Sequence, residues 1–91
     1  MSKINPSKKK NKTISLLLRD GCNCSYCGIK FDNIEQITLD HVYPKSLGGP
    51  NANKNMLLSC STCNGNKGNM LLTQFIRAYE IKITRILARF L

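Results

Sequence analysis

Acidic residues are scarce in this chain of 91 residues, which has 5 Asp and Glu against 14 Lys and Arg. The resulting formal charge of +9 causes repulsion within a folded domain and attracts polyanions. Nucleic acid is the partner that this charge favours, ahead of an anionic membrane surface. A basic protein without an anionic partner is the remaining alternative.

Long apolar runs are absent too, so no segment is predicted to span a bilayer. The first residues, MSKINPSKKKNK, have no apolar stretch after their lysines and therefore no secretory signal. We expect the protein in the cytoplasm or another reducing compartment, where closely spaced cysteines bind metals more often than they form disulfides. A chain this short forms one small domain, whose limited core needs added stabilisation.

Polar and apolar segments alternate in an order that predicts the organisation of the domain. Residues 1–12 are expected to form a disordered basic arm, either a solubilising tail or a phosphate-binding arm. Residues 13–72 are expected to fold, beginning with a short helix that Thr13 caps and Gly21 ends. The apolar side of this helix is expected to carry Ile14, Leu17 and Leu18.

Two short apolar or β-branched segments, 37–42 and 56–60, are predicted to be strands. The stretch 45–55 between them is rich in Gly, Pro and Asn and is predicted to be a loop. A short helix is expected from Ser61 to about Lys67.

The last part of the chain, residues 73–91, is predicted to contain an amphipathic helix over 74–90 with Thr73 as its cap. Its apolar side is expected to contain Phe75, Ile76, Tyr79, Ile83, Ile86, Leu87 and Phe90. The helix is expected to pack on the domain or extend it. A role at a membrane surface or in a dimer is the alternative.

Four of the five cysteines form two CxxC pairs, Cys24 with Cys27 and Cys60 with Cys63. Two residues between thiolates allow both sulfurs to reach one zinc ion at about 2.3 Å. Four thiolates complete a tetrahedron and leave no position for water, so the expected zinc ion is structural. Cys22 is expected to be a spare thiol, because Cys24 has the better-spaced partner.

Histidine occurs once, at His41, in the long segment that separates the two cysteine pairs. A lone histidine is usually an ordinary surface or core residue. This one follows Asp40 at the end of a predicted strand, and Asn64 follows the last paired cysteine on a helix whose start the zinc would fix. The metal-held strands and helix could therefore bring an acid, a base and an amide oxygen together.

These segments resemble the HNH nuclease family, whose fold is also called ββα-metal or His-Me finger. The resemblance rests on LDHVYPKSLGG, then Asn55, then CSTCNGNKGN, preceded by LLLRDGCNCSYCG as the helix and first zinc knuckle of the four-cysteine branch. It covers about residues 14–70 and implies an α+β fold, a small ββα-metal domain with a structural four-cysteine zinc site. His41 matches the family's first His and Asn55 its central Asn, while Asn64 replaces its last His in an HNN form.

The resemblance implies hydrolysis of DNA phosphodiester bonds with one divalent ion. His41 is the expected general base, and Asn55 is expected to orient the loop or His41 unless it is an ordinary turn asparagine. Asp40 and Asn64 offer oxygen ligands, which suit Mg²⁺ or Mn²⁺ better than zinc. Neighbouring side chains on a regular strand point to opposite faces, so Asp40 and His41 cannot both face one ion from an ideal strand. Lys67 is expected either to contact phosphate or to be solvated.

A non-catalytic zinc-knuckle module that binds nucleic acid is the main alternative, and it explains the cysteines and the charge. It leaves unexplained the cluster Asp40, His41, Asn55 and Asn64. A zinc-stabilised protein-interaction domain that uses the C-terminal helix is a third possibility. The preference for DNA over RNA rests on the family resemblance alone.

Overall fold

The computed structural model describes the backbone of residues 6–87 and the side chains of residues 9–87. At its centre lie two antiparallel strands, β1 (Ile37–His41) and β2 (Met56–Cys60), which pair from end to end. Helix α2 (Ser61–Lys67) follows β2 directly. The predicted strands and helix are therefore confirmed, and the mixed α+β class with them.

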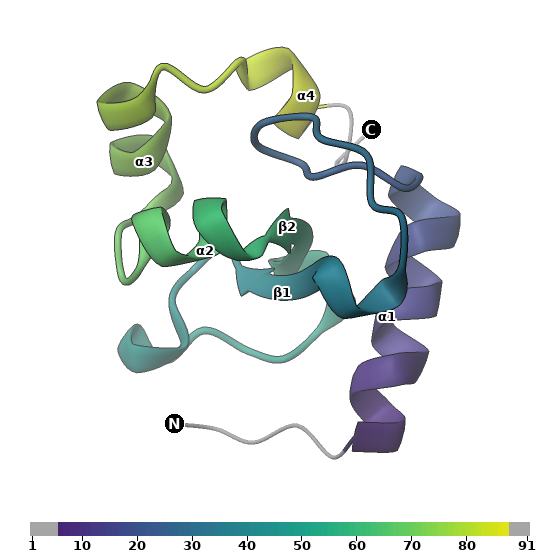
Figure 1. Ribbon diagram of the computed structural model, residues 1–91. Coiled ribbons are helices and arrows are strands. Elements are labelled where there is room, and N and C mark those ends of the chain that lie inside the picture. Colours follow the sequence, from purple (N-terminus) through teal and green to yellow (C-terminus); the bar gives the residue numbers. More distant parts are fainter. Residues whose placement is uncertain (1–5, 88–91) are drawn as a thin grey trace.

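Further helices surround this centre (Figure 1). Helix α1 (Pro6–Asp20) packs against β2 along one side of the sheet, and α3 (Leu72–Tyr79) and α4 (Ile83–Leu87) follow α2. The loop between the strands contains two single-turn 3-10 helices, Lys45–Leu47 and Asn53–Asn55. Within residues 6–87, no helix is both long and apolar enough to cross a membrane.

The core is built around β2. Residues 56–58 are fully buried, so side chains on both faces of this strand are covered. Leu16 of α1 belongs to the same core, as do Tyr26 and Phe75. The rings of Tyr26 and Phe75 meet edge to face, with centroids 5.0 Å apart. This geometry suits the quadrupoles of the two rings and fixes α3 against the segment that carries the first cysteine pair.

The start of α1 differs from the prediction. The helix begins at Pro6, a residue type that is favoured in the first turn, so the expected disordered arm is wrong for residues 6–12. Residues 1–5 of that arm lie outside the described part of the chain. Thr13 is not a cap, because it lies inside the helix and its Oγ1 donates to the carbonyl oxygen of Lys9 at 2.8 Å.

The buried face of α1 differs as well. Leu16 is fully buried and Leu17 partly, whereas Ile14 and Leu18 are exposed, Leu18 by 84%. The cause is a pair of cations on the same face as Leu16, since Lys12, Leu16 and Arg19 follow helical spacing. Their charged ends bond to the loop that leads into β2, and this turns Leu16 rather than its neighbours into the core.

The single helix predicted over 74–90 is also wrong, because two helices occupy this region and the last residues of the prediction, 88–90, lie outside the described part. Glu80 ends α3 in the left-handed region, with φ of 52°. The N–H of Ile81 donates to the carbonyl oxygen of Ile76 at 3.0 Å, which closes the helix end. Thr73 lies inside α3 and is not its cap.

Candidate active site and metal centre

The four paired cysteines meet at one point of the structure. Cys24 and Cys27 come from the turn after α1, Cys60 ends β2 and Cys63 lies in the first turn of α2. Their sulfur atoms all lie within 4.8 Å of one another, and the sulfurs of Cys27 and Cys60 are 3.8 Å apart. Four sulfurs at about 2.3 Å from one zinc ion are separated by about 3.8 Å, so the cluster could hold such an ion.

Backbone N–H groups point at the sulfurs, as they do in metal-binding knuckles. The N–H of Cys60 donates to the sulfur of Cys24 at 3.4 Å, and the N–H of Cys63 donates to the sulfur of Cys60 at 3.4 Å. Burial opposes ionisation of Cys24, but the N–H groups of Cys27, Cys60 and Tyr26 lower its pKa to about 7. Burial and the adjacent thiols raise the pKa of Cys63. Four thiolates at this distance require a cation, which makes a metal ion the natural occupant.

The first knuckle is a tight turn whose shape depends on Gly28. Its φ of 81° lies in the left-handed region, and its N–H donates to the carbonyl oxygen of Cys24 at 3.0 Å. A Cβ atom at this position would lie 2.7 Å from the guanidinium carbon of Arg85 in α4. Arg85 also donates to the carbonyl oxygen of Tyr26 at 3.3 Å, so α4 places a positive charge against the knuckle.

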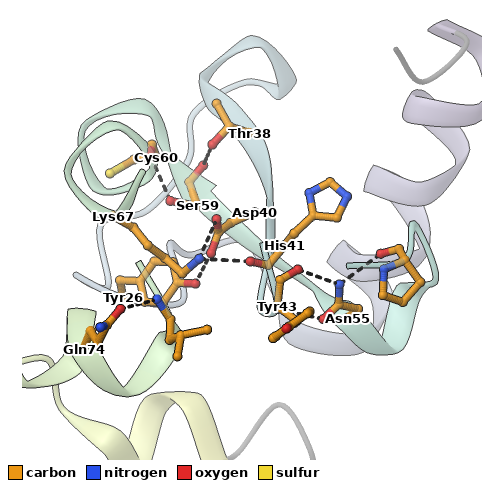
Figure 2. Close-up of polar contacts among 12 residues, drawn as sticks. Tyr26, Thr38, Asp40, His41, Tyr43, Asn55, Ser59, Cys60, Lys67 and Gln74 are labelled. Carbon is orange, nitrogen blue, oxygen red and sulfur yellow. Dashed lines mark hydrogen bonds and ion pairs between the residues drawn. The ribbon is translucent and has the colours of Figure 1, made fainter. Parts of the chain in front are cut away.

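Asp40 and His41 point to opposite sides of the end of β1 (Figure 2), as strand alternation predicts. Asp40 is only 4% exposed. Its Oδ2 accepts a hydrogen bond from the hydroxyl of Tyr26, and its Oδ1 lies 3.3 Å from Nζ of Lys67. Burial raises the pKa of Asp40, and the contacts with Tyr26 and Lys67 oppose this effect.

Lys67 is neither solvated nor available to phosphate, contrary to both interpretations of the sequence. Its side chain is fully buried, and its ammonium also donates to the carbonyl oxygen of His41 at 2.9 Å. A buried ammonium requires such partners, because water no longer solvates it. Lys67 therefore balances the charge of Asp40 and connects α2 to β1.

His41 is partly exposed, and its ring lies on the other side of β1 from the Asp40 carboxylate. Its Nε2 lies 2.8 Å from Oδ1 of Asn51 in the loop between the strands. Among the described residues, no hydrogen bond involves its Nδ1. One ring nitrogen is thus held by the protein and the other is open.

Asn55 holds the loop rather than the histidine. Its Oδ1 accepts from the N–H of Tyr43 at 2.9 Å, and its Nδ2 donates to the carbonyl oxygens of Tyr43 and Pro50 at 3.2 and 2.9 Å. The backbone carbonyl oxygen of Asn55 also accepts a hydrogen bond from the N–H of Val42 at 2.8 Å. The side chain thus ties both ends of the loop beside His41.

Asn64 lies on α2, three residues before Lys67 and therefore on the same face of the helix. That face is directed at the end of β1, since Lys67 contacts both Asp40 and His41. Within residues 9–87, no hydrogen bond joins the side chains of Asn64 and Asp40. Asp40 and Lys67 thus meet at one end of the sheet, and helical spacing places Asn64 on the face of α2 that carries Lys67.

The donor atoms suit a hard divalent ion, because Asp40 offers a carboxylate and Asn64 an amide oxygen. Both carboxylate oxygens of Asp40 are, however, engaged by Tyr26 and Lys67. Each carboxylate oxygen keeps a second lone pair that can bind an ion, but the charge of the ion would repel the Lys67 ammonium. Lys67 is the natural one to move, since both it and the ion compensate the same negative charge.

Two residues of this site, Tyr26 and Asn51, were not identified from the sequence, and neither was the buried position of Lys67. Tyr26 lies inside the first CxxC pair, whose pattern points to its cysteines alone. The helical spacing from Asn64 to Lys67 was a signal of a shared face, but nothing in the sequence showed that the lysine is buried. Asn51 lies in a loop rich in asparagine and carries no distinguishing signal.

Comparison with known proteins agrees with this architecture. The profile of the HNH endonuclease family matches residues 24–70, which is more than half of the chain. The chain is also similar to the CRISPR-associated endonuclease Cas9 of Corynebacterium diphtheriae, with 41% identity over 54 residues. That match covers 56% of this chain and only 5% of the length of the relative. The chain belongs to the HNH endonuclease family.

Proposed function

We propose that the chain hydrolyses phosphodiester bonds of DNA, with His41 as the general base and with Asp40 and Asn64 as ligands of a single Mg²⁺ or Mn²⁺ ion. The observation that carries this proposal is the environment of His41. Its imidazole is partly exposed at the end of β1, held through Nε2 and open at Nδ1, as a group that accepts a proton from water needs to be. The choice of DNA rests on family analogy.

Phosphodiester hydrolysis needs an activated water, neutralisation of charge on the phosphate and a stabilised leaving oxygen. Nδ1 of His41 takes the proton of the attacking water, while the water oxygen bonds to phosphorus and the bond to the leaving oxygen breaks. The divalent ion, when bound, supplies positive charge to the phosphate and the leaving oxygen. The +9 charge of the chain attracts the polyanionic substrate.

Asn55 has a supporting role in this proposal. It is 9% exposed, and its side-chain amide forms hydrogen bonds with the loop backbone. It therefore keeps the segment beside His41 in place without contact to the reacting atoms. The cysteine cluster is likewise structural, since four sulfur ligands leave no open position on a tetrahedral ion.

The direct test is incubation of the purified chain with supercoiled plasmid, with and without Mg²⁺ or Mn²⁺. We expect conversion to nicked or linear DNA only with the ion present. DNA that is bound but not cut with either ion would contradict the proposal.

That outcome would favour a non-catalytic module that binds nucleic acid. One observation supports this second candidate: the Lys67 ammonium already balances the charge of Asp40 at 3.3 Å. An ion is therefore not needed for the charge balance of the fold. The plasmid experiment separates the two functions because only the proposed nuclease requires the divalent ion.

Competition between Lys67 and the ion leads to a prediction about stability. Lys67→Met leaves Asp40 buried without its cation, which should lower the free energy of unfolding by about 3–5 kcal/mol in the absence of divalent ions. Mn²⁺ should restore part of this loss by binding the folded state, and it should stabilise the parent less. Thermal unfolding at increasing Mn²⁺ concentration measures both effects.

The matched control is the double variant Lys67→Met/Asp40→Asn, which removes the carboxylate as well as the ammonium. We expect Mn²⁺ to have little effect on its melting temperature. If Mn²⁺ stabilises the double variant as much as Lys67→Met, the ion does not bind at Asp40.

A further inference from the structure

The side chain of Asn51 is the polar group that holds the His41 ring. Its Oδ1 lies 2.8 Å from Nε2 of His41. An amide oxygen only accepts hydrogen bonds, so this contact fits the tautomer in which Nε2 carries the proton and donates it. In the neutral ring, Nδ1 is then the nitrogen with the free lone pair.

Asn51 is itself held from a distant part of the chain. The ammonium of Lys12 in α1 donates to the backbone carbonyl oxygen of Asn51, and it lies 3.4 Å from Oδ1 of Asn53. Arg19, two turns further along α1, donates to the carbonyl oxygens of Asn53 and Met56 at 3.0 and 2.9 Å. Two cations on one face of α1 thus secure the segment that returns the chain to β2.

We infer that Asn51 is a positioning residue that fixes the ring orientation and the tautomer of His41, and that helix α1 sets the place of Asn51 through Lys12. This inference rests on the proposed role of His41 as the general base. It adds helix α1 to the elements that position the general base, although α1 lies outside residues 24–70, the segment matched by the family profile.

The contact selects which nitrogen accepts the proton. With Nε2–H bonded to Asn51, Nδ1 is the ring nitrogen that has no hydrogen-bond partner among the described residues. Without Asn51, the ring can rotate and both neutral tautomers become accessible. A general base has to lie within hydrogen-bond reach of the proton that it removes, so loss of this orientation costs rate even though the base remains.

The experiment uses the full chain with selective ¹⁵N labelling of histidine. Because His41 is the only histidine, the spectrum reports a single ring. At a pH where the imidazole is neutral and without Mg²⁺, we expect Nε2 to be the protonated nitrogen and Nδ1 the unprotonated one. In Asn51→Leu, both shifts should move toward the averaged values of a mixture of tautomers. Asn51→Asp keeps an acceptor oxygen and should retain the parent pattern.

Lys12→Met tests the contribution of α1 and should shift the two nitrogen signals in the same direction as Asn51→Leu, by a smaller amount. The matched control on the same helix is Lys10→Met, which replaces an exposed lysine and should leave both signals unchanged. If Asn51→Leu does not fold, Asn51→Ala and Lys12→Met carry the same test. In plasmid cleavage, Asn51→Leu should lower kcat by about 10- to 100-fold, a size typical of lost positioning.

Either of two results would overturn the inference. One is a parent ring with its proton on Nδ1, and the other is a set of Asn51 and Lys12 variants with unchanged nitrogen signals. These results do not depend on catalysis. If the signals behave as expected but the parent cuts no DNA, the proposed function fails and the positioning contact stands. If the parent cuts DNA and the signals do not move, the function stands and the positioning role fails.

Discussion

Replacement of His41 with Ala should reduce the rate of DNA cleavage by about two to four orders of magnitude, which is the usual contribution of a general base. The fold should survive, because His41 is partly exposed and its ring bonds only to the side chain of Asn51 among the described residues. Asp40 and Lys67 would keep their contact on the other side of the strand. The measurement is the single-turnover cleavage rate as a function of Mg²⁺ concentration, with circular dichroism as the check on folding.

A base and a metal ligand should respond differently to the ion. Extra Mg²⁺ should not rescue His41→Ala, whereas it should restore part of the rate lost in Asn64→Ala. Asn64→Asp keeps an oxygen in place and should retain more activity than Asn64→Ala. Unchanged cleavage by His41→Ala would mean that another group activates the water, and the assignment of the general base would be wrong.

The largest effect on stability is expected from the cysteine cluster. Cys60→Ser should abolish metal binding and unfold the domain, because a structural zinc ion contributes on the order of 10 kcal/mol to domains of this kind. A loss of this size is comparable to the whole free energy of unfolding of a domain, which is only about 5–15 kcal/mol. Cys60 is also the residue at which β2 passes into α2, so both elements depend on its ligand role. Zinc content per chain and far-ultraviolet circular dichroism measure the two consequences.

Cys22→Ser is the matched control, because Cys22 is exposed and lies outside the cluster. It should bind one ion per chain and keep the parent spectrum. A Cys60→Ser protein that remains folded and metal-loaded would exclude the four-sulfur site.

The parts of the fold that follow from local signals were predictable. Strand alternation predicted that Asp40 and His41 point to opposite faces, and the structure has them so. The two CxxC pairs predicted a common metal centre, because the spacing within each pair already sets the sulfur positions. The Gly- and Pro-rich stretch 45–55 predicted a loop for the same local reason.

What was not predictable depends on contacts between distant segments. The lysine-rich start of α1 has the composition of a disordered arm, yet it is helical, and the helix is joined to the loop before β2 by contacts of Lys12 and Arg19 with residues far away in the sequence. The break at Glu80 has no Gly or Pro to mark it, and it allows Ile86 to be buried. The burial of Lys67 and the contact between His41 and Asn51 likewise arise only when the chain has folded.

The ladder between β1 and β2 has the cysteine cluster at one end and His41 at the other. Ile37 pairs with Cys60 at the first end, and His41 pairs with Met56 at the second, about 13 Å away at the usual rise per residue. A slip of one residue in this short pairing would exchange the two faces of β1 and place the imidazole where the carboxylate now lies. Because Cys60 and Cys63 are anchored to Cys24 and Cys27, a bound ion would forbid that slip. An ion held by the four cysteines would thus decide, at the far end of the strand pair, which side of β1 carries the imidazole and which side carries the carboxylate.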